Sequence, residues 1–169
     1  MVLLGLLGPG LVLVVVRAAE RPALTRAAAP VPTVAADPAD PTADRPAADV
    51  LRAWDEQRAA AYAAGSVRRL RQLYVAGSAA ARSDVHVLAA YRHRGLVVEG
   101  MRTQVLALRV LEQRPRRLRL QVTDRLAAAV AVGPGTRVVL PRDRPDTRRL
   151  TLLRGADGSW RVVSVLPVG

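Results

Sequence analysis

The chain has 169 residues, which is enough for one domain with a hydrophobic core and an extension at one end. It contains no cysteine, which excludes disulfides, thiol catalysis, cysteine-based metal sites and lipid attachment through a lipobox cysteine. Phenylalanine is absent and aromatic residues make up only 3%, so the core must be built from valine, leucine and alanine.

The formal net charge of +12 is unevenly distributed along the chain. All 26 basic residues are arginines, a bias that indicates a GC-rich genome and weakens arginine counts as evidence about partners. Residues 1–49 hold four arginines and five acids (net −1), whereas residues 50–169 hold 22 arginines and nine acids (net +13). Such a charge favours association with anionic lipid, envelope polymer or nucleic acid, and charge alone does not choose among them.

Residues 2–16 form an apolar run that is broken only by three glycines and one proline. A membrane-spanning helix needs roughly 20 apolar residues, so the length suits a signal-peptide core or an anchor whose beginning is missing. No basic residue precedes the run, so either the true start lies upstream of Met1 or the segment works without a charged leader. We expect residues 1–19 to be an uncleaved membrane anchor, with a cleaved signal or a buried helix as alternatives.

Residues 20–48 have the composition of a disordered linker. Six prolines lie among alanine, aspartate and threonine, with almost nothing large enough to bury. Such a segment cannot offset the entropy cost of ordering, and at about 3.1 Å per residue it reaches ~90 Å when fully extended. The sequence therefore predicts a tether that holds a folded domain, residues 49–169, away from a membrane.

Three helical patterns open the expected domain. Asp49 is a good N-cap for a helix over residues 50–64, and Ser66 for a second helix that ends near Gly77. Ser83 or Asp84 begins the third, which Gly95 closes. Apolar side chains fall on one stripe of each helix, namely Leu51, Trp54, Ala61 and Tyr62, then Val67, Leu70, Leu73 and Tyr74, then Val85, Leu88 and Tyr91.

From Leu96 onward the apolar pattern changes to a period of two. This pattern predicts strands over residues 96–99, 103–112, 117–132, 148–154 and 159–166, with turns at 114–116, 133–135 and 156–158 and an exposed loop over 141–146. Helices followed by such strands predict an α+β fold in which the helices pack on one face of a curved antiparallel sheet.

Certain short segments also carry a family resemblance. The segments are Trp54, Tyr62-Ala63-Ala64-Gly65-Ser66, Val122-Thr123-Asp124-Arg125 and the closing Asp157-Gly158-Ser159-Trp160-Arg161-Val162. Their order and spacing resemble the nuclear-transport-factor-2-like (SnoaL-like) superfamily. Within it, the chain looks like membrane-anchored extracytoplasmic members from actinobacteria, such as the Mce-associated proteins of lipid-import systems. The resemblance implies a cone, in which a bent sheet wraps around helices and leaves a pocket at the wide end. Its members include isomerases, dehydratases and epoxide hydrolases, and also non-catalytic assembly modules.

Asp124 is the sharpest candidate for chemistry. On the strand over residues 117–132, Leu118, Leu120, Val122 and Leu126 share one face, and Asp124 is a carboxylate on that face. Burial inside a cone would raise the pKa of its carboxyl toward that of a general base. We favour the alternative, in which Asp124 lies at a bulge or at the cone mouth and pairs with Arg125 or a helix arginine, because one carboxylate without a polar partner is not a site.

Four aromatic side chains are further candidates to line the pocket with Asp124, although such residues more often pack in the core: Trp54, Tyr62, Tyr74 and Tyr91. His86 and His93 are seven residues apart, about 10.5 Å along a helix, which is too far to share one metal ion. We therefore expect no metal and no cofactor.

The turn between the two long strands carries an arginine cluster that is a candidate for binding an anionic surface: Arg114, Arg116, Arg117 and Arg119. The alternative is a solvated hairpin without a partner. Nucleic acid is disfavoured because no aromatic residues are interleaved with the arginines and no helix has the character of a groove reader.

We therefore expect a membrane-anchored, extracytoplasmic accessory, assembly or ligand-binding module that is not an enzyme. The expected partners are the membrane, an envelope protein or a second copy of the chain, and a small apolar ligand. Periplasmic domains of type IV secretion components are a related alternative. A cone-fold enzyme of the isomerase or dehydratase type, with Asp124 as general base and a tyrosine as donor, is the alternative from another class. A third is a secreted basic protein that binds an envelope polyanion.

Overall fold

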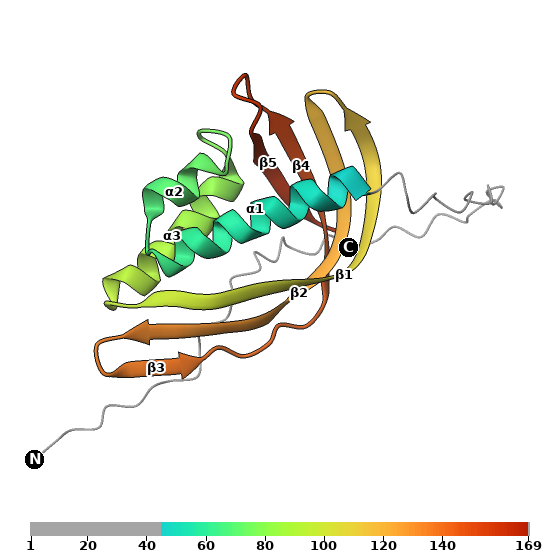
Figure 1. Ribbon diagram of the computed structural model, residues 1–169. Helices are drawn as coiled ribbons and strands as arrows, with labels where there is room; N and C mark the ends of the chain where they lie inside the picture. The colour runs from blue at the N-terminus through green and yellow to red at the C-terminus, as the bar shows by residue number, and fades with distance from the viewer. Residues whose placement is uncertain (1–44, 169) are drawn as a thin grey trace, which may run out of the picture. The chain divides into compact units, whose positions relative to one another are not determined.

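The computed structural model describes residues 45–168, which form three helices followed by an antiparallel sheet (Figure 1). The elements are α1 (Arg45–Ala63), α2 (Val67–Gln72), α3 (Ala79–His93), β1 (Val97–Arg114), β2 (Arg117–Gly133), β3 (Thr136–Val139), β4 (Asp146–Arg154) and β5 (Trp160–Pro167). The expected α+β fold is confirmed. The predicted anchor over residues 1–19 and most of the predicted linker lie outside the described residues.

The sheet is organised around β2, which pairs with three other strands. The strand order is β1-β2-β4-β5, with every neighbouring pair antiparallel, and β3 pairs with the last part of β2. The β1–β2 ladder shifts register at Glu99/Arg102, Val105/Ala107 and Val110/Glu112. Such bulges bend and twist a strand pair, and Figure 1 shows β1 and β2 curving around α1. The sheet therefore has a concave face toward the helices and a convex outer face.

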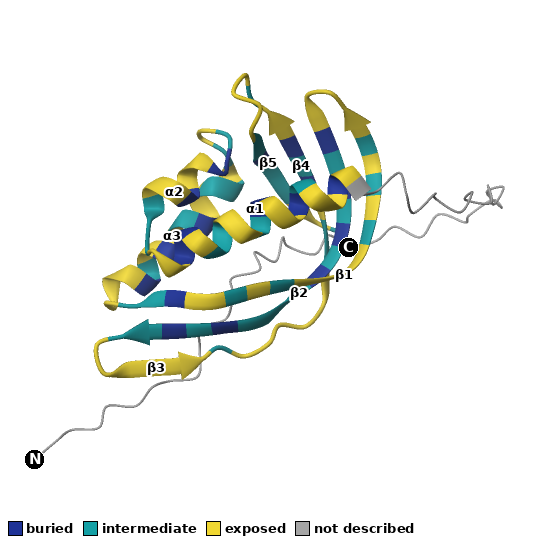
Figure 2. Ribbon diagram, in the orientation of Figure 1, coloured by how far each residue is buried: buried dark blue, intermediate teal, exposed yellow. Residues whose placement is uncertain are grey.

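The two faces of β2 differ as the alternation predicts. Leu118, Leu120 and Val122 are at most 2% exposed and belong to the core, whereas Arg117 is exposed and Arg119 and Gln121 are half-buried. Figure 2 shows buried and less buried positions alternating along β2. The largest fully buried side chains are all leucine or valine: Leu70, Leu88, Leu118, Leu120, Leu150, Leu152, Val98, Val122 and Val162. The aliphatic core expected from the composition is present. None of the helices in residues 45–168 has the length and apolarity that crossing a membrane requires.

The first helix begins earlier than its sequence signals indicate. α1 starts at Arg45, so Asp49 is not its N-cap, and residues 45–48, which we predicted to be linker, are helical. Pro46 is compatible with the first turn, where its missing N–H would have no intrahelical acceptor. Ala47 is 1% exposed and gives this turn a place in the core. Asp49 forms an exposed ion pair with Arg52 at 3.1 Å instead.

The third helix also begins earlier, at Ala79, with Ser78 as its N-cap. The predicted start at Ser83 or Asp84 is therefore wrong, and Asp84 is buried within the helix. Ser66 is confirmed as the N-cap of α2, but the helix ends at Gln72 and not near Gly77 as predicted. The local sequence does not distinguish an aspartate at the N-cap from an aspartate within the helix. Only the tertiary contacts described below distinguish the two positions.

Two features of the sheet differ from the prediction. β1 is one continuous strand where two were expected. The sequence predicted two strands because Gly100, at φ +60°, lies in the first irregular part of the ladder and interrupts the alternation of apolar residues. β3 was not predicted, since all four of its residues are exposed and carry no alternating pattern of burial.

Candidate functional site

A buried carboxylate on α3, Asp84, lies at the centre of a polar cluster. Arg58 donates from Nε to Oδ2 at 2.7 Å and from Nη2 to Oδ1 at 2.5 Å. The hydroxyls of Tyr62 and Tyr74 donate to Oδ1 at 2.7 Å and to Oδ2 at 2.6 Å. Each oxygen of Asp84 thus accepts two hydrogen bonds, so a carboxylate that is only 9% exposed is fully satisfied.

The charges of this cluster are fixed by its geometry. Burial raises the pKa of Asp84, but the Arg58 charge and the hydrogen bonds from Arg58, Tyr74 and Tyr62 outweigh burial and lower the pKa below its ordinary value. Burial and the nearby Asp84 charge raise the pKa values of both tyrosines. Near neutral pH the cluster is an ion pair with two neutral phenols, which leaves no group ready for proton transfer. It is a cross-link between α1, α3 and the segment after α2.

The aromatic candidates gather mainly around this cross-link. Trp54 donates from Nε1 to the Leu73 carbonyl at 3.1 Å and meets Tyr74 edge to face, with ring centroids 5.6 Å apart. Tyr91 is buried on α3 and has the Arg94 guanidinium 5.2 Å from its ring centroid. None of the four aromatic candidates lines either of the two cavities described below.

Asp124 is buried on the concave face, at 5% exposure, and pairs with Arg148 of β4. Arg148 Nη2 lies 2.5 Å from Asp124 Oδ2. Arg148 is opposite Val122 in the β2–β4 register, which makes it a diagonal neighbour of Asp124 on the same face. The expected partner was wrong: Arg125 donates to Gln104, and no helix arginine is bonded to Asp124 within residues 45–168.

A third carboxyl, Asp55 of α1, has no ion-pair partner among the described residues. Burial raises its pKa from 3.8 to about 6, against the opposing charges of Arg58 and Arg148 and with a further contribution from Asp124. The nearby Thr103 side chain favours the charged form. Asp55 is therefore the carboxyl of this region that changes protonation close to neutral pH.

Asp55 lies in an open groove between α1 and β1, which we call the α1–β1 groove, with a cavity volume of about 590 Å³. Its floor and walls are mainly apolar, and its polar groups are those of Asp55, Thr103 and three charged side chains. The lining residues are Ala48, Leu51, Arg52, Asp55, Glu56 and Ala59 of α1, and Met101, Arg102, Thr103, Val105 and Leu108 of β1.

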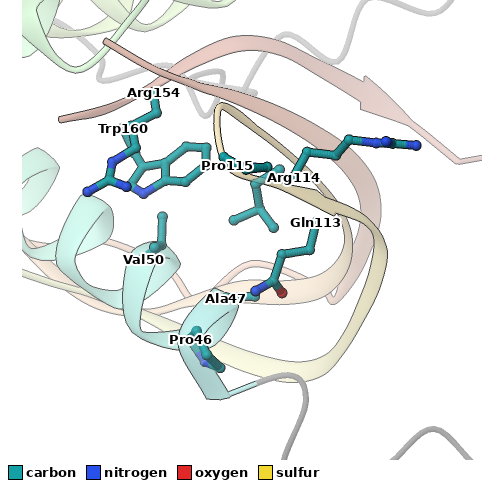
Figure 3. Close-up of a pocket in the computed structure, with 9 residues that line it drawn as sticks. Pro46, Ala47, Val50, Gln113, Arg114, Pro115, Arg154 and Trp160 are labelled. Atoms are coloured by element: carbon teal, nitrogen blue, oxygen red, sulfur yellow. The ribbon is translucent and has the colours of Figure 1, made fainter. Parts of the chain in front are cut away.

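A second cavity, of about 390 Å³, lies between the start of α1, the β1–β2 hairpin and the adjoining ends of β4 and β5 (Figure 3). Its lining is Pro46, Ala47, Val50, Gln113, Arg114, Pro115, Leu118, Arg154 and Trp160. Figure 3 shows Trp160 above Val50, while the Arg114 side chain extends away from both. No carboxyl group lines this cavity, so it offers less chemistry than the α1–β1 groove.

The remaining candidates are on the surface. His86 and His93 are exposed on α3. The four arginines of the predicted cluster lie at the β1–β2 hairpin, and one carboxylate, Glu112, is 3.5–3.7 Å from three of them: Arg114, Arg117 and Arg119.

Sequence reasoning missed Asp55, Arg58, Asp84 and Arg148. A signal existed for two of them. Asp55 follows Leu51 by four residues on α1, and Asp84 precedes Leu88 by four on α3, so both carboxylates continue an apolar stripe. A carboxylate in that position is costly unless it is paired, which makes it a candidate for a specific contact.

No protein-family model matches this sequence, and no curated protein matches it. Among solved structures, the intermembrane-space region of the chloroplast protein ARC6 is 18% identical, with TM-score 0.49 over 73% of this chain and 96% of that one. Aln2 from a Streptomyces species is 15% identical, with TM-score 0.46 over 75% and 90%. A cystatin-like domain from Nostoc punctiforme is 17% identical, with TM-score 0.43 over 75% and 77%. All three scores are below 0.5, and none of these similarities assigns an activity to this chain.

Asp84→Ala is expected to destabilise the protein by about 3–5 kcal/mol, because it leaves the Arg58 guanidinium buried without its partner. Urea denaturation at pH 7, followed by tryptophan fluorescence, measures the free energy of unfolding. The double variant Arg58→Met/Asp84→Leu replaces both charges by apolar groups and should recover a large part of the loss. A double variant no more stable than Asp84→Ala would contradict the role of the ion pair.

Asp55 should make stability depend on pH. Its pKa is about 6 in the folded protein and 3.8 ordinarily, so its contribution is fully present below pH 4 and is lost as the pH rises through 6. Asparagine does not titrate, so Asp55→Asn keeps its stability as the pH rises. The free energy of unfolding of the variant minus that of the parent should therefore increase by up to about 3 kcal/mol between pH 4 and pH 7.5. Urea denaturation across this range measures the difference, with Glu56→Gln as the control for loss of a surface carboxylate. A difference that stays constant with pH would contradict the assignment.

Proposed function

We propose that this protein is a membrane-tethered, extracytoplasmic binding module that holds a small apolar molecule in the α1–β1 groove and performs no chemistry on it. One observation carries the proposal: an open, mainly apolar groove of about 590 Å³ contains a carboxyl, Asp55, that no arginine of the described residues neutralises in an ion pair. Ligand sites typically have volumes of about 300–1,000 Å³, are lined mostly by apolar groups and contain a few polar ones.

The lining defines the class of ligand. Leu51, Met101 and Leu108 offer apolar contacts to a hydrocarbon body. Asp55 and Thr103 face the same groove and can hydrogen-bond to a hydroxyl or amino group on that body. A lipid-like molecule with one donor group fits this arrangement better than a polar metabolite does.

The alternative function, an enzyme with Asp124 as general base, has less support. Arg148 already binds the Asp124 carboxylate at 2.5 Å, and Arg58 binds that of Asp84 at the same distance. A base must be within hydrogen-bond reach of the proton that it abstracts, and neither Asp124 nor Asp84 lines the α1–β1 groove. Asp55 is then a lone acid–base group, which suits binding better than catalysis.

The sequence outside the described residues supplies the proposed location. The apolar run over residues 2–16 and the proline-rich segment after it have the composition of an anchor and a tether. Together with the resemblance to Mce-associated proteins, they favour an accessory role in a lipid-import complex of the cell envelope. The partner would be an envelope protein of that complex or a second copy of the chain.

Filling the groove should weaken ligand binding. Ala59 lines the α1–β1 groove, whereas its neighbour Ala60 is exposed and does not. We expect Ala59→Trp to weaken binding of the neutral apolar dye Nile red at least tenfold, while Ala60→Trp leaves it within about twofold, because only the first ring occupies the cavity. Fluorescence titration measures both, and equal effects of the two variants would contradict the groove as the binding site.

Export can be tested with reporters at the C-terminus of the full chain. Alkaline phosphatase, which is active only outside the cytoplasm, should be active when fused to this protein, and deletion of residues 2–16 should abolish that activity. An inactive alkaline phosphatase fusion, together with an active fusion to a reporter that works only in the cytoplasm, would overturn the proposed location. That outcome would leave the groove test unaffected.

A further inference from the structure

The convex face of the sheet carries a concentrated positive charge at the end where the β1–β2 hairpin turns. Five arginines lie there on the outward face of three neighbouring strands, and we call them the outer-face arginines: Arg109 and Arg114 of β1, Arg117 and Arg119 of β2, and Arg149 of β4. Their strands place them opposite one another. Arg114 pairs in register with Arg117, while Gln121 lies between Arg109 and Arg149.

Little in the described part of the chain neutralises this face. Glu112 is the one acid that the register places among the outer-face arginines, and its carboxylate is shared by three of them at 3.5–3.7 Å. Five positive charges and one negative charge give a local net charge of +4. The Arg114 and Arg117 side chains remain 74% and 52% exposed. Like charges directly opposite in a sheet are destabilising, so folding alone does not favour the Arg114–Arg117 pair.

The same face also presents aliphatic side chains and no aromatic ones. Leu153 pairs in register with Arg117, and Leu166 with Arg149; they are 37% and 57% exposed. The five aromatic residues of the chain lie elsewhere, four of them in the core and Trp160 in the cavity at the start of α1. Single-stranded nucleic acid requires aromatic platforms for stacking, whereas a phospholipid surface accepts guanidinium groups at its phosphates and leucines between its head groups.

We propose that the outer-face arginines, with Leu153 and Leu166, dock this domain on an anionic phospholipid bilayer. The charge complementarity is with the lipid phosphates, and the exposed leucines contact the boundary between head groups and acyl chains. Near an anionic bilayer each arginine strengthens binding about fivefold at moderate salt. The docking surface is separate from the α1–β1 groove, so the proposal does not depend on the groove holding a ligand.

The test is sedimentation of the purified full chain with vesicles of phosphatidylcholine alone or with 30% phosphatidylglycerol. Neutral vesicles measure whatever binding the apolar N-terminal residues contribute, and the excess on anionic vesicles measures the electrostatic part. The triple variant Arg114→Gln/Arg117→Gln/Arg119→Gln should lose the excess about 100-fold. The matched control, Arg68→Gln/Arg69→Gln/Arg71→Gln, removes three exposed arginines from α2 and should retain it within about threefold.

Three outcomes would overturn the proposal. Equal losses in both triple variants would show attraction to the total charge of the protein and not to this face. No excess on anionic vesicles at 50 mM salt would exclude lipid docking. An excess that is abolished by a soluble polyanion such as polyphosphate at equal charge concentration would identify a polymer as the preferred partner. Thermal unfolding of both variants checks that the fold is retained, and Leu166→Ala, which keeps the charge, should weaken anionic binding at least twofold.

Discussion

The ion pair between Arg58 and Asp84 is the contact on which the arrangement of the helices depends. It joins α1 to α3, and the tyrosine hydroxyls bring in a second residue of α1 and the segment after α2. The short α2 has one fully buried side chain, Leu70, so it contributes little apolar area of its own to packing. A specific polar contact therefore sets the orientation that aliphatic packing alone would leave loosely defined.

The same contact determines where the α1–β1 groove lies. Asp55 precedes Arg58 by three residues on α1, so fixing the guanidinium against Asp84 also fixes the face that α1 turns toward β1. Arg58 Nη1 is 3.9 Å from the sulfur of Met101, a residue of the groove wall. The charge of Arg58 also opposes the rise in the pKa of Asp55 that burial causes. The structural cluster and the candidate site thus share one side chain, and a change at Arg58 affects both.

Sequence patterns were sufficient where a rule is local and insufficient where it is not. The alternation along β2 placed Asp124 on the inner face correctly, because a period of two determines the face without reference to other strands. It could not supply the partner, since Arg148 is 24 residues away and its position depends on the register between β2 and β4. Asp84 shows the converse. Its local context allows an N-cap or a buried partner equally, and only the position of Arg58 decides between them.

The two faces of the sheet follow opposite electrostatic rules. On the concave side, where water is largely excluded, Asp84 and Asp124 each have an arginine at 2.5 Å, because an uncompensated buried charge costs several kcal/mol. On the convex side, screening by water and salt reduces, without removing, the cost of arginines that face each other across β1 and β2. A sequence in which every basic residue is arginine satisfies both rules with one residue type, so position in the sheet, and not the number of arginines, separates structural charges from those free to meet a partner.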